Sequence, residues 1–250
     1  MTNWNSVYGK MSGGRWEITE PMIKFISRYV QRRVGVNEYV KRKNVDLALD
    51  VGCGNGNSIE FLFKQGIQTK GIDLSEIAIT NTKERMNQYG FQPEIMVQNA
   101  QDMTFNDKTF DLVLSDGVLD HVNNEISENI ISEIYRIMKD DAYLFISLRS
   151  IYSSEFGRGK YMNNNSYLLE GGYEDGELQH FYDLKEISML LKDFNIFDIE
   201  LHEEIFPNFY SLDKHFIQSS TGEKKYLNNL ERSFENPLKN SRWFIAAEKK

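Results

Sequence analysis

Short apolar runs alternate with segments of helical periodicity between residues 45 and 148. The runs predict five strands, at residues 45–51, 69–73, 94–98, 110–115 and 142–148. Between them, apolar residues recur at three- and four-residue spacing and predict helices at 58–65, 77–86 and 126–138. Strands that alternate with helices are typical of a parallel sheet covered by helices. This part of the chain therefore predicts an α/β fold.

The two flanks of this segment have a different character. Thr19, Glu20 and Pro21 predict a helix start, and a buried stripe of Met22, Ile23, Ile26, Tyr29 and Val30 would extend the helix to about Val34. Asp183 predicts the cap of a helix through Leu191, followed by closing strands at 196–202 and 242–248. We interpret residues 1–250 as a single domain, with a lid and helix at 1–44 and a cofactor-binding core at 45–148. Polar insertions at 149–182 and 203–240 would shape a substrate pocket.

Composition narrows the class of protein further. The 250 residues are 40% hydrophobic and 26% charged, as in a soluble globular chain. A formal net charge of -8 disfavours a nucleic-acid partner. No apolar run approaches the length of a membrane span, no secretion signal opens the chain, and a lone cysteine forms no internal disulfide. We therefore expect a cytoplasmic protein, whose state as monomer or homodimer stays open.

The strongest motif is a glycine-rich loop at residues 50–56, DVGCGNG, between a predicted strand and a predicted helix. Glycines allow a tight turn and let a ligand lie against bare backbone at the carboxyl ends of the strands. A dinucleotide fingerprint would place its third glycine one residue later, where Asn57 stands. This spacing favours a cofactor without a pyrophosphate.

Two acidic residues flank the loop. Asp73, at the end of the second strand, could accept both hydroxyls of a ribose, or it could merely cap the following helix, for which Ser75 is better placed. Asp50 could hold the ammonium group of a cofactor that carries an amino acid, whereas a pyrophosphate would repel it. Cys53 is interpreted as a small packing residue of the loop rather than a nucleophile.

Four blocks in this order resemble the class I S-adenosylmethionine (SAM)-dependent methyltransferases, most closely the small-molecule branch that includes ubiquinone and menaquinone biosynthesis. They are residues 50–56, 71–75 (GIDLS), 97–105 (VQNAQDMTF) and 110–121 (FDLVLSDGVLDH). The resemblance implies a Rossmann-like sheet of seven strands, mostly parallel with one antiparallel strand, and helices on both faces. It also implies SAM as cofactor, S-adenosylhomocysteine (SAH) as product, and a small-molecule methyl acceptor.

The resemblance also assigns roles around the cofactor. Leu74 would lie against the adenine, Asn99 and Ala100 would read its edge, and the Ser115 carbonyl would meet the amino group. Many relatives have aspartate at the position of Asn99, so a weaker contact is expected there. The predicted cofactor-binding residues are Tyr8, Trp16, Asp50, Gly52, Cys53, Gly54, Gly56, Asp73, Leu74, Asn99, Ala100 and Ser115.

Methyl transfer requires mainly that a nucleophile be held in line and water excluded, with a base if the acceptor is a hydroxyl. His121 and His180 are the candidate bases, although His121 could equally serve packing and His180 could be a solvated loop residue. His202 and His215 have no motif around them, so surface or packing roles suffice. No ligand spacing predicts a metal.

Aromatic residues suggest the walls of the acceptor pocket. Tyr8 and Trp16 would close over the sulfonium, though both could instead be core residues, and Arg15 would bind a carboxylate or an anionic substrate. The predicted substrate-binding residues are Arg15, Arg149, Tyr152 and Tyr182. Tyr161, Tyr167 and Tyr173 are further candidates for one wall.

Three other functions remain open at the level of sequence. An RNA methyltransferase would use the basic cluster Arg28, Arg32, Arg33, Lys41, Arg42 and Lys43, which could also be a solvated surface. A nicotinamide-dependent oxidoreductase is disfavoured by the glycine spacing. A SAM-binding protein without catalysis would fit Asn99 and the uncertain base.

Overall fold

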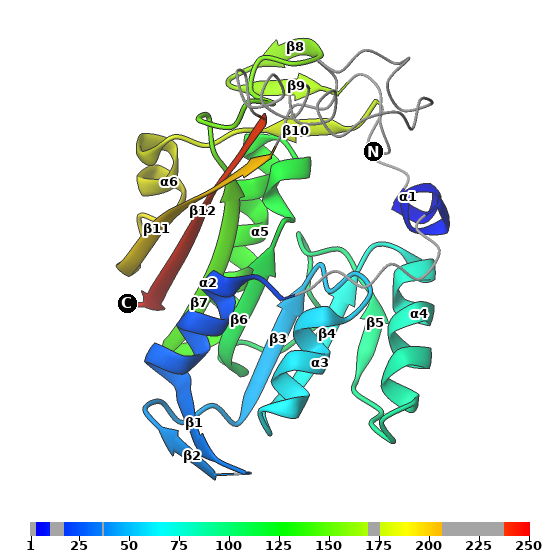
Figure 1. Cartoon of the computed structure of the whole chain (residues 1–250), viewed down its shortest axis with the longest axis vertical. Coiled ribbons are helices and arrows are strands. Elements are labelled where there is room, and N and C mark those ends of the chain that lie inside the picture. The colour runs from blue at the N-terminus through cyan, green and yellow to red at the C-terminus, as the bar shows by residue number, and fades with distance from the viewer. Residues whose placement is uncertain (1–3, 11–17, 37, 170–175, 207–237) are drawn as a thin grey trace, which may run out of the picture.

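A seven-stranded sheet forms the centre of the computed structural model (Figure 1), which describes residues 4–10, 18–36, 38–169, 176–206 and 238–250. The strand order is β11-β12-β7-β6-β3-β4-β5. Its members are β3 (Leu47–Val51), β4 (Gln68–Asp73), β5 (Ile95–Val97), β6 (Phe110–Asp116), β7 (Met138–Arg149), β11 (Phe194–Phe206) and β12 (Leu238–Lys249). Within this sheet, β12 runs antiparallel to both of its neighbours and the other pairings are parallel. The expected α/β sheet with one antiparallel strand is confirmed.

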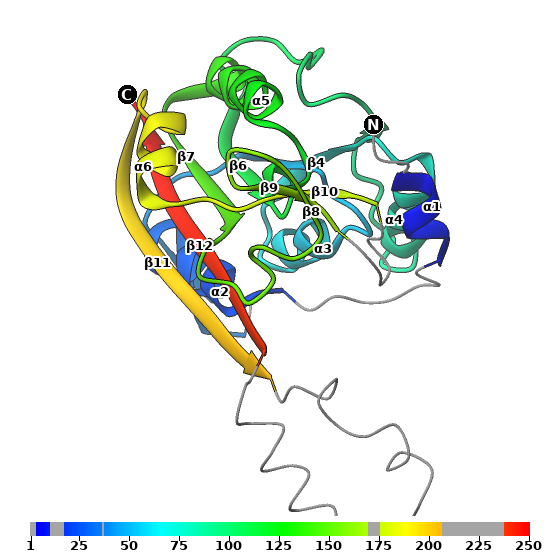
Figure 2. The same cartoon turned by 90° about the horizontal axis from the view of Figure 1, so that it is seen from above.

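Helices cover both faces of this sheet. One face carries α2 (Glu20–Phe25), the π-helical turn η1 (Ile26–Val30), α3 (Asn57–Lys64) and α4 (Glu76–Asn87). The other carries α5 (Asn124–Ile137) and α6 (Leu184–Leu190), as the two views in Figures 1 and 2 show. The alternation in β3 explains this layering, because Ala48 packs toward α2 and α3 whereas Leu49 packs toward α5.

The helix predicted from Thr19 to about Val34 is shorter than expected. It ends at Val30, and β1 (Gln31–Gly35) then pairs antiparallel with β2 (Glu38–Lys41) as a hairpin. The apolar positions that continue the helical spacing are buried only up to Val30, while Val34 is exposed. Ile23, predicted to be buried, is also exposed. Residues 31–35 therefore pair with β2 and do not extend the helix, because Val34 is the one apolar side chain that they offer for a helix to bury.

The polar insertion after β7 contains structure that its composition did not predict. β8 (Lys160–Asn163), β9 (Ser166–Leu168) and β10 (Leu178–His180) form a separate three-stranded antiparallel sheet. Figure 1 shows this small sheet above the carboxyl ends of the central strands. A short helix, α1 (Trp4–Lys10), lies beside α4 at the same end of the molecule. Helix α1 and the small sheet therefore both lie at the carboxyl ends of the central strands.

No helix in the part of the chain that the structure describes combines the length and the apolar character needed to cross a bilayer.

Candidate active site

The glycine-rich loop forms the floor of a cavity of about 850 Å³ at the carboxyl ends of β3, β4 and β6. Gly52, Gly54 and Gly56 all have positive φ angles, of 73°, 49° and 76°. An added Cβ would collide with Val118 at Gly52, with Tyr8 at Gly54 and with Thr82 at Gly56. The loop therefore needs glycine for its backbone conformation and for the close approach of its neighbours.

Asp73 holds the loop from the end of β4. Its carboxylate accepts the backbone N–H of Gly54 at 2.9 Å and that of Ser75 at 2.8 Å. Ser75, in turn, caps α4 by accepting the N–H of Ala78, as the sequence indicated. Burial raises the pKa of Asp73, and the backbone N–H groups oppose this shift. Two backbone donors leave lone pairs on both carboxylate oxygens for a further ligand in the cavity.

Asp50 and Asp116 add two more carboxyl groups to the same cavity. Burial, together with the nearby charges of Asp116 and Asp73, raises the pKa of Asp50 to about 8. The Asp116 carboxylate accepts the hydroxyl of Ser147. Three carboxyl groups so close together are arranged to meet positive charge, because an added cation relieves their mutual repulsion.

The α1 helix covers this end of the cavity. Asn5 accepts a hydrogen bond from the Ser75 hydroxyl at 2.7 Å, which fixes α1 to the start of α4. As a result, Trp4 and Tyr8 line the cavity, and the Tyr8 hydroxyl stands over Gly54. Burial, followed by the charge of Asp73, raises the pKa of Tyr8 above its usual range, so its hydroxyl stays protonated. Arg15 and Trp16 lie outside the described residues.

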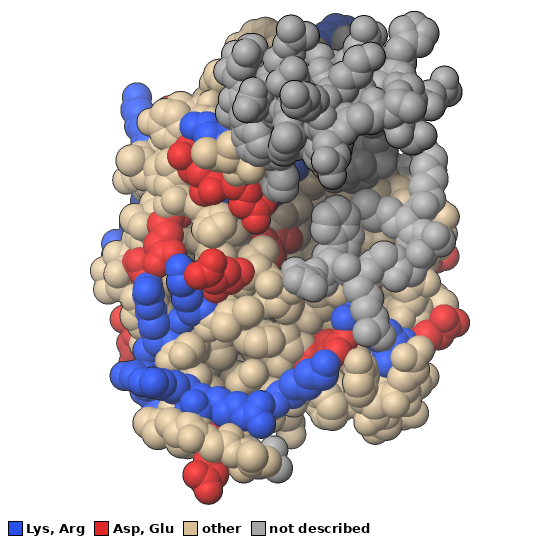
Figure 3. All heavy atoms as spheres, viewed as in Figure 1, with Lys and Arg blue, Asp and Glu red and all other residues tan. Residues whose placement is uncertain are grey.

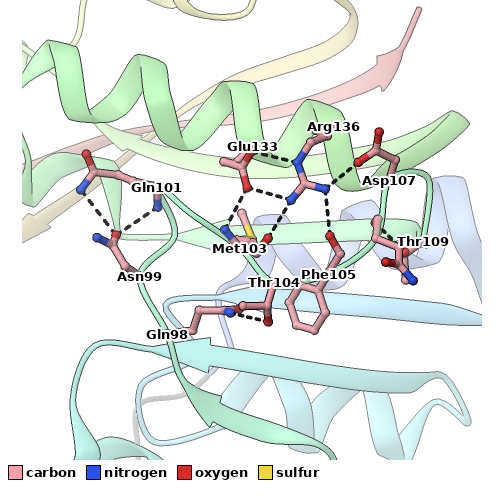
Figure 4. Close-up of polar contacts among 11 residues, drawn as sticks. Gln98, Asn99, Gln101, Met103, Thr104, Phe105, Asp107, Thr109, Glu133 and Arg136 are labelled. Atoms are coloured by element: carbon pink, nitrogen blue, oxygen red, sulfur yellow. Dashed lines mark hydrogen bonds and ion pairs between the residues drawn. The ribbon is translucent and has the colours of Figure 1, made fainter.

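The loop after β5 supplies the side of the cavity where adenine is expected. Gln98, Asn99 and Ala100 of this loop line the cavity beside Leu74, which follows β4 and exposes 51% of its surface. The Asn99 amide oxygen accepts the backbone N–H of Gln101 at 3.0 Å, so its NH₂ group is the part without a partner among the described residues (Figure 4). An unpaired NH₂ is not the acceptor that adenine's exocyclic amine would require. The oxygen also accepts the side-chain amide of Gln101 at 3.4 Å, so both of its lone pairs have partners in the turn.

Helix α5 fixes this loop from behind (Figure 4). Arg136 donates to the carbonyl oxygens of Met103 and Phe105, each at 2.8 Å, and Glu133 accepts the backbone N–H of Met103 at 2.9 Å. Arg136 and Glu133 also pair with each other at 2.8 Å. The Arg136 guanidinium thus holds two carbonyl oxygens of the loop at once through charge-assisted hydrogen bonds.

His121 lies on the opposite wall, in the short 3₁₀ turn η2 (Leu119–His121). Its ring packs edge-on against Trp4 with centroids 4.8 Å apart. Its Nδ1 atom is buried and has no hydrogen-bond partner among the described residues. Burial lowers the pKa of His121 to about 4, with the charge of Asp120 opposing the shift. The imidazole is therefore neutral at physiological pH.

Several residues predicted for the site do not line this cavity. His180 is fully buried instead, with its Nδ1 atom 2.8 Å from the Ser166 hydroxyl, because β10 turns it into the small sheet. Tyr182 is also buried, and its hydroxyl donates to the Leu119 carbonyl oxygen at 3.1 Å. Tyr152 packs against Trp243. Ser115 is buried in β6, and its neighbours Asp116 and Gly117 line the cavity in its place.

The structure keeps other predicted residues at the cavity. Cys53 lines it as a buried thiol whose pKa burial raises well above its usual value, which makes it a poor nucleophile. Arg149 lines it from the end of β7. Of the outer tyrosines, Tyr161 and Tyr167 lie in the small sheet and Tyr173 lies outside the described residues, as does His215.

Sequence reasoning missed several cavity residues, among them Arg242, His202 and Trp4. Arg242 and His202 lie on β12 and β11, which reach the cavity only through strand pairing across the sheet. No local motif marks them. Trp4 could have been found from its spacing, since it precedes Tyr8 by one helical turn.

The donor set and shape of the cavity fit SAM. The carboxyl groups of Asp50 and Asp116 suit an ammonium or a sulfonium, Asp73 retains lone pairs for a ribose diol, and the exposed face of Leu74 suits an adenine ring. A pyrophosphate would be repelled by the same carboxyl groups. Among the described residues, no group of three His, Cys, Asp or Glu side chains could hold a metal ion.

Comparisons with known proteins agree with this geometry. Residues 49–146 match the family model described as "Methyltransferase domain". A solved SAM-dependent methyltransferase from Methanosarcina mazei has the same fold, with a TM-score of 0.64 at 20% identity over 94% of this chain and 99% of that one.

Two curated relatives have names that describe different methyl acceptors. The eEF1A lysine and N-terminal methyltransferase of Xenopus laevis is 29% identical over 54% of this chain and 21% of its own length. A ubiquinone biosynthesis O-methyltransferase of Coxiella burnetii is 28% identical over 48% of this chain and 47% of its own length. In three curated relatives, the matched part spans 66%, 39% and 21% of the relative. The family match at residues 49–146 includes the glycine-rich loop and β3 to β6 of the sheet, so this part of the chain is similar to a methyltransferase domain and the whole chain shares the fold of a solved SAM-dependent methyltransferase.

Proposed function

We propose that this protein transfers the methyl group of SAM to an oxygen or nitrogen of a small acceptor that enters the same cavity. The observation that carries the proposal is that the glycine-rich loop, Asp73 and His121 all line one cavity of about 850 Å³. This volume lies in the upper part of the range for small-molecule sites, about 300–1,000 Å³. It leaves room for an acceptor beside the cofactor.

The bound cofactor supplies an activated methyl group, so the protein's own task is to bind, orient and exclude water. Asp73 would accept the ribose hydroxyls, and Asp50 would face the ammonium end. Trp4 and Tyr8 of α1 close the cavity on one side and bring aromatic faces to a cationic ligand. These residues position the cofactor and the acceptor, and positioning supplies most of the rate enhancement in methyl transfer.

His121 is the residue we assign to proton removal from a hydroxyl acceptor. It is neutral at physiological pH, and its Nδ1 atom has no partner among the described residues, so it can accept a proton or a hydrogen bond. An amine that enters in its neutral form would need the imidazole only to orient it. His180 is not proposed as a base, because it is buried away from the cavity.

A small acceptor is favoured over RNA by the distribution of charge. Figure 3 shows Lys and Arg gathered across the region of β1 and β2, away from the cavity at the opposite end of the strands. Within the basic cluster, Arg28 pairs with Glu200 at 2.9 Å and Lys43 with Glu248 at 3.6 Å. The net charge is -8. The unpaired Cys53 suits a reducing compartment, and we place the activity in the cytoplasm.

The test is to incubate the full chain with SAM and a panel of small alcohols, phenols and amines, and to measure SAH and methylated product by mass spectrometry. Total RNA and a lysine-bearing protein such as eEF1A are the competing acceptors. Product from the small-molecule panel alone supports the proposal. Product from RNA or protein alone overturns it, and SAH binding without any product would indicate a binding protein.

His121→Gln provides a matched variant for the chemical step. For a hydroxyl acceptor we expect turnover to fall by about 10²–10⁴-fold, which is the usual contribution of a general base. The affinity for SAH, measured by calorimetry, should stay unchanged, because the loop and Asp73 are untouched. His180→Gln serves as the control and should retain turnover. Equal turnover in His121→Gln and the wild type would remove His121 from the mechanism.

A further inference from the structure

We propose that the methyl acceptor carries an anionic group, a carboxylate or a phosphate, and that Arg149 and Arg242 bind this group at the end of the cavity away from Asp50. The proposal rests on the proposed function for the reaction itself, whereas the binding of the anion can be tested on its own. The supporting observation is the register of β7, β12 and β11, which places Arg149, Arg242 and His202 in one row across the sheet.

Register brings the three side chains together. Arg242 is paired with Arg149 of β7 on one side and with His202 of β11 on the other. Residues directly opposite each other in antiparallel strands project to the same face, with Cβ atoms about 4.5–5.5 Å apart. All three residues line the same cavity as Asp73 and His121. The row is therefore a wall of the cavity built from two guanidinium groups and one imidazole.

Like charges directly opposite each other destabilise a sheet, so this pair of arginines needs an explanation. Asp120, fully buried in η2, accepts the backbone N–H of Arg149 at 2.6 Å and pairs with the Arg242 guanidinium at 2.7 Å. Burial opposes ionisation of Asp120, but Arg242 and Arg149 outweigh it and hold the pKa of this carboxyl below its usual value. Asp120 is thus a positioning residue whose negative charge offsets the repulsion between the two paired arginines.

Arg149 retains a donor that nothing in the described structure uses. It is nine-tenths buried, and its Nε atom is buried without a hydrogen-bond partner. Its guanidinium contacts Glu155, whose side chain is 43% exposed and hence well solvated. A buried N–H without an acceptor costs about 1–3 kcal/mol. Arg149 also lines the cavity, and its planar guanidinium suits the bidentate geometry of a carboxylate or a phosphate bound there.

Charge is unevenly distributed around the cavity. Asp50 and Asp73 lie at the glycine-rich loop, and Arg149, Arg242 and His202 lie along β7, β12 and β11. Ser147 stands between the two groups, because its hydroxyl donates to Asp116 and accepts from Arg242 at 3.0 Å. A cationic cofactor at the loop and an anionic acceptor at the arginines would therefore lie side by side. His121 follows Asp120 in η2, and the charges of both arginines act on its imidazole. The wall formed by Arg149, Arg242 and His202 therefore borders His121, the residue assigned to take the proton from the nucleophile.

The binding test uses three probes with one phenyl body and different head groups: benzoate, phenyl phosphate and benzyl alcohol. Each is titrated into ¹⁵N-labelled full-length protein saturated with SAH, and the arginine Nε–H and histidine resonances are followed by NMR. We expect benzoate or phenyl phosphate to shift the Arg149 and Arg242 signals at a concentration at least tenfold below that of benzyl alcohol. The stronger of the two anions identifies the preferred group.

Arg149→Gln is the main variant, because the hydrogen bond from Arg149 to Asp120 comes from the backbone and is kept in the variant. It should weaken binding of the preferred anion at least tenfold and leave SAH affinity unchanged. Arg242→Lys keeps a cation beside Asp120 and provides a second variant that is expected to fold. Arg32→Gln is the charge-matched control, since Arg32 is exposed on β1 and should bind the anion like the wild type. Circular dichroism checks the fold of each.

The outcomes separate the two proposals. Equal binding of benzoate, phenyl phosphate and benzyl alcohol overturns the anion site, as does equal loss of binding in Arg149→Gln and Arg32→Gln. A preference for anions in a protein that neither binds SAM nor forms SAH would uphold the site and overturn the proposed methyl transfer. Turnover of neutral acceptors alone would do the reverse.

Discussion

The Asp50 carboxyl combines burial with two acidic neighbours, Asp116 and Asp73. Its pKa of about 8 means that it is mainly protonated in the free protein at pH 7. A cationic ligand favours the ionised form, so binding must release a proton below the raised pKa. We therefore expect ionisation of Asp50 to contribute to the pH dependence of cofactor binding.

We expect the affinity for SAM to rise by up to about tenfold per pH unit between pH 6 and 8, because each binding event then displaces one proton. Calorimetry in buffers of different ionisation enthalpy measures both the affinity and the proton release. Asp50→Asn cannot ionise and should give a flat profile over the same range. An equally steep profile in Asp50→Asn would show that another group is responsible.

Asp73 has a different role, since backbone N–H groups already stabilise its ionised form. Replacing it with alanine should weaken SAH binding by about 1–3 kcal/mol, the usual cost of removing a buried hydrogen-bond partner, which is about 5- to 150-fold in Kd. The loss includes the loop, because Gly54 and Ser75 lose their acceptor. Asp46→Ala, an exposed site just before β3, is the control. Unchanged affinity in Asp73→Ala would exclude the assigned ribose contact.

At the scale of elements, helix α1 and the glycine-rich loop approach each other closely where Tyr8 stands over Gly54. A Cβ on Gly54 would lie 2.5 Å from the Tyr8 hydroxyl oxygen and 3.4 Å from the ring carbon that carries it. Gly54→Ala should therefore push α1 outward and weaken SAH binding about tenfold. Adding Tyr8→Phe removes the oxygen, and it should restore part of this loss.

A double-mutant cycle by calorimetry measures this coupling. Alanine at a positive φ also costs about 1–2 kcal/mol of backbone strain, which Tyr8→Phe cannot relieve. Gly90→Ala isolates this strain, because Gly90 has a φ of 65° and no atom within 4 Å of an added Cβ. Strictly additive effects of Gly54→Ala and Tyr8→Phe would mean that α1 does not close on the loop.

The strands, the loop and Asp73 could be predicted because each depends on local pattern: apolar runs, glycines after a strand and an acid at the next strand end. The β1–β2 hairpin could not, since the sequence predicted that the helix continues to about Val34, whereas it ends at Val30. His180 illustrates a similar limit. Its place before Tyr182 and a capped helix suggested the cavity edge, but pairing of β10 with β9 turned it into the small sheet.

The acceptor wall shows why the rest of the site was beyond a reading of the sequence. Arg149 and Arg242 are 93 positions apart, and only the register of β7 with β12 makes them neighbours. Asp120, which holds both, stands beside His121 in a segment whose resemblance to the family suggested only the histidine. Residues from distant strands become a site through topology, and no spacing along the chain encodes it.

At the scale of the whole molecule, the strand order places the last strand of the described chain inside the central sheet. The last strand, β12, lies between β7 and β11, so the central sheet is complete only when the final residues have inserted. The cofactor loop follows β3, which is separated from β12 by the two strands β6 and β7. We therefore propose that residues 1–250 unfold as one cooperative domain, in which a ligand at the loop stabilises every strand.

SAH at a hundredfold excess over its Kd should stabilise the folded state by about 2.7 kcal/mol. For a chain of this size, that corresponds to a rise in Tm of about 5–11 °C. Calorimetry should show one transition that moves as a whole, and tryptophan fluorescence and far-ultraviolet circular dichroism should give the same midpoint. Asp73→Ala should show a smaller rise at the same SAH concentration. Two transitions, of which SAH moves only one, would mean that the cofactor-binding core folds independently of the strands that carry the acceptor wall.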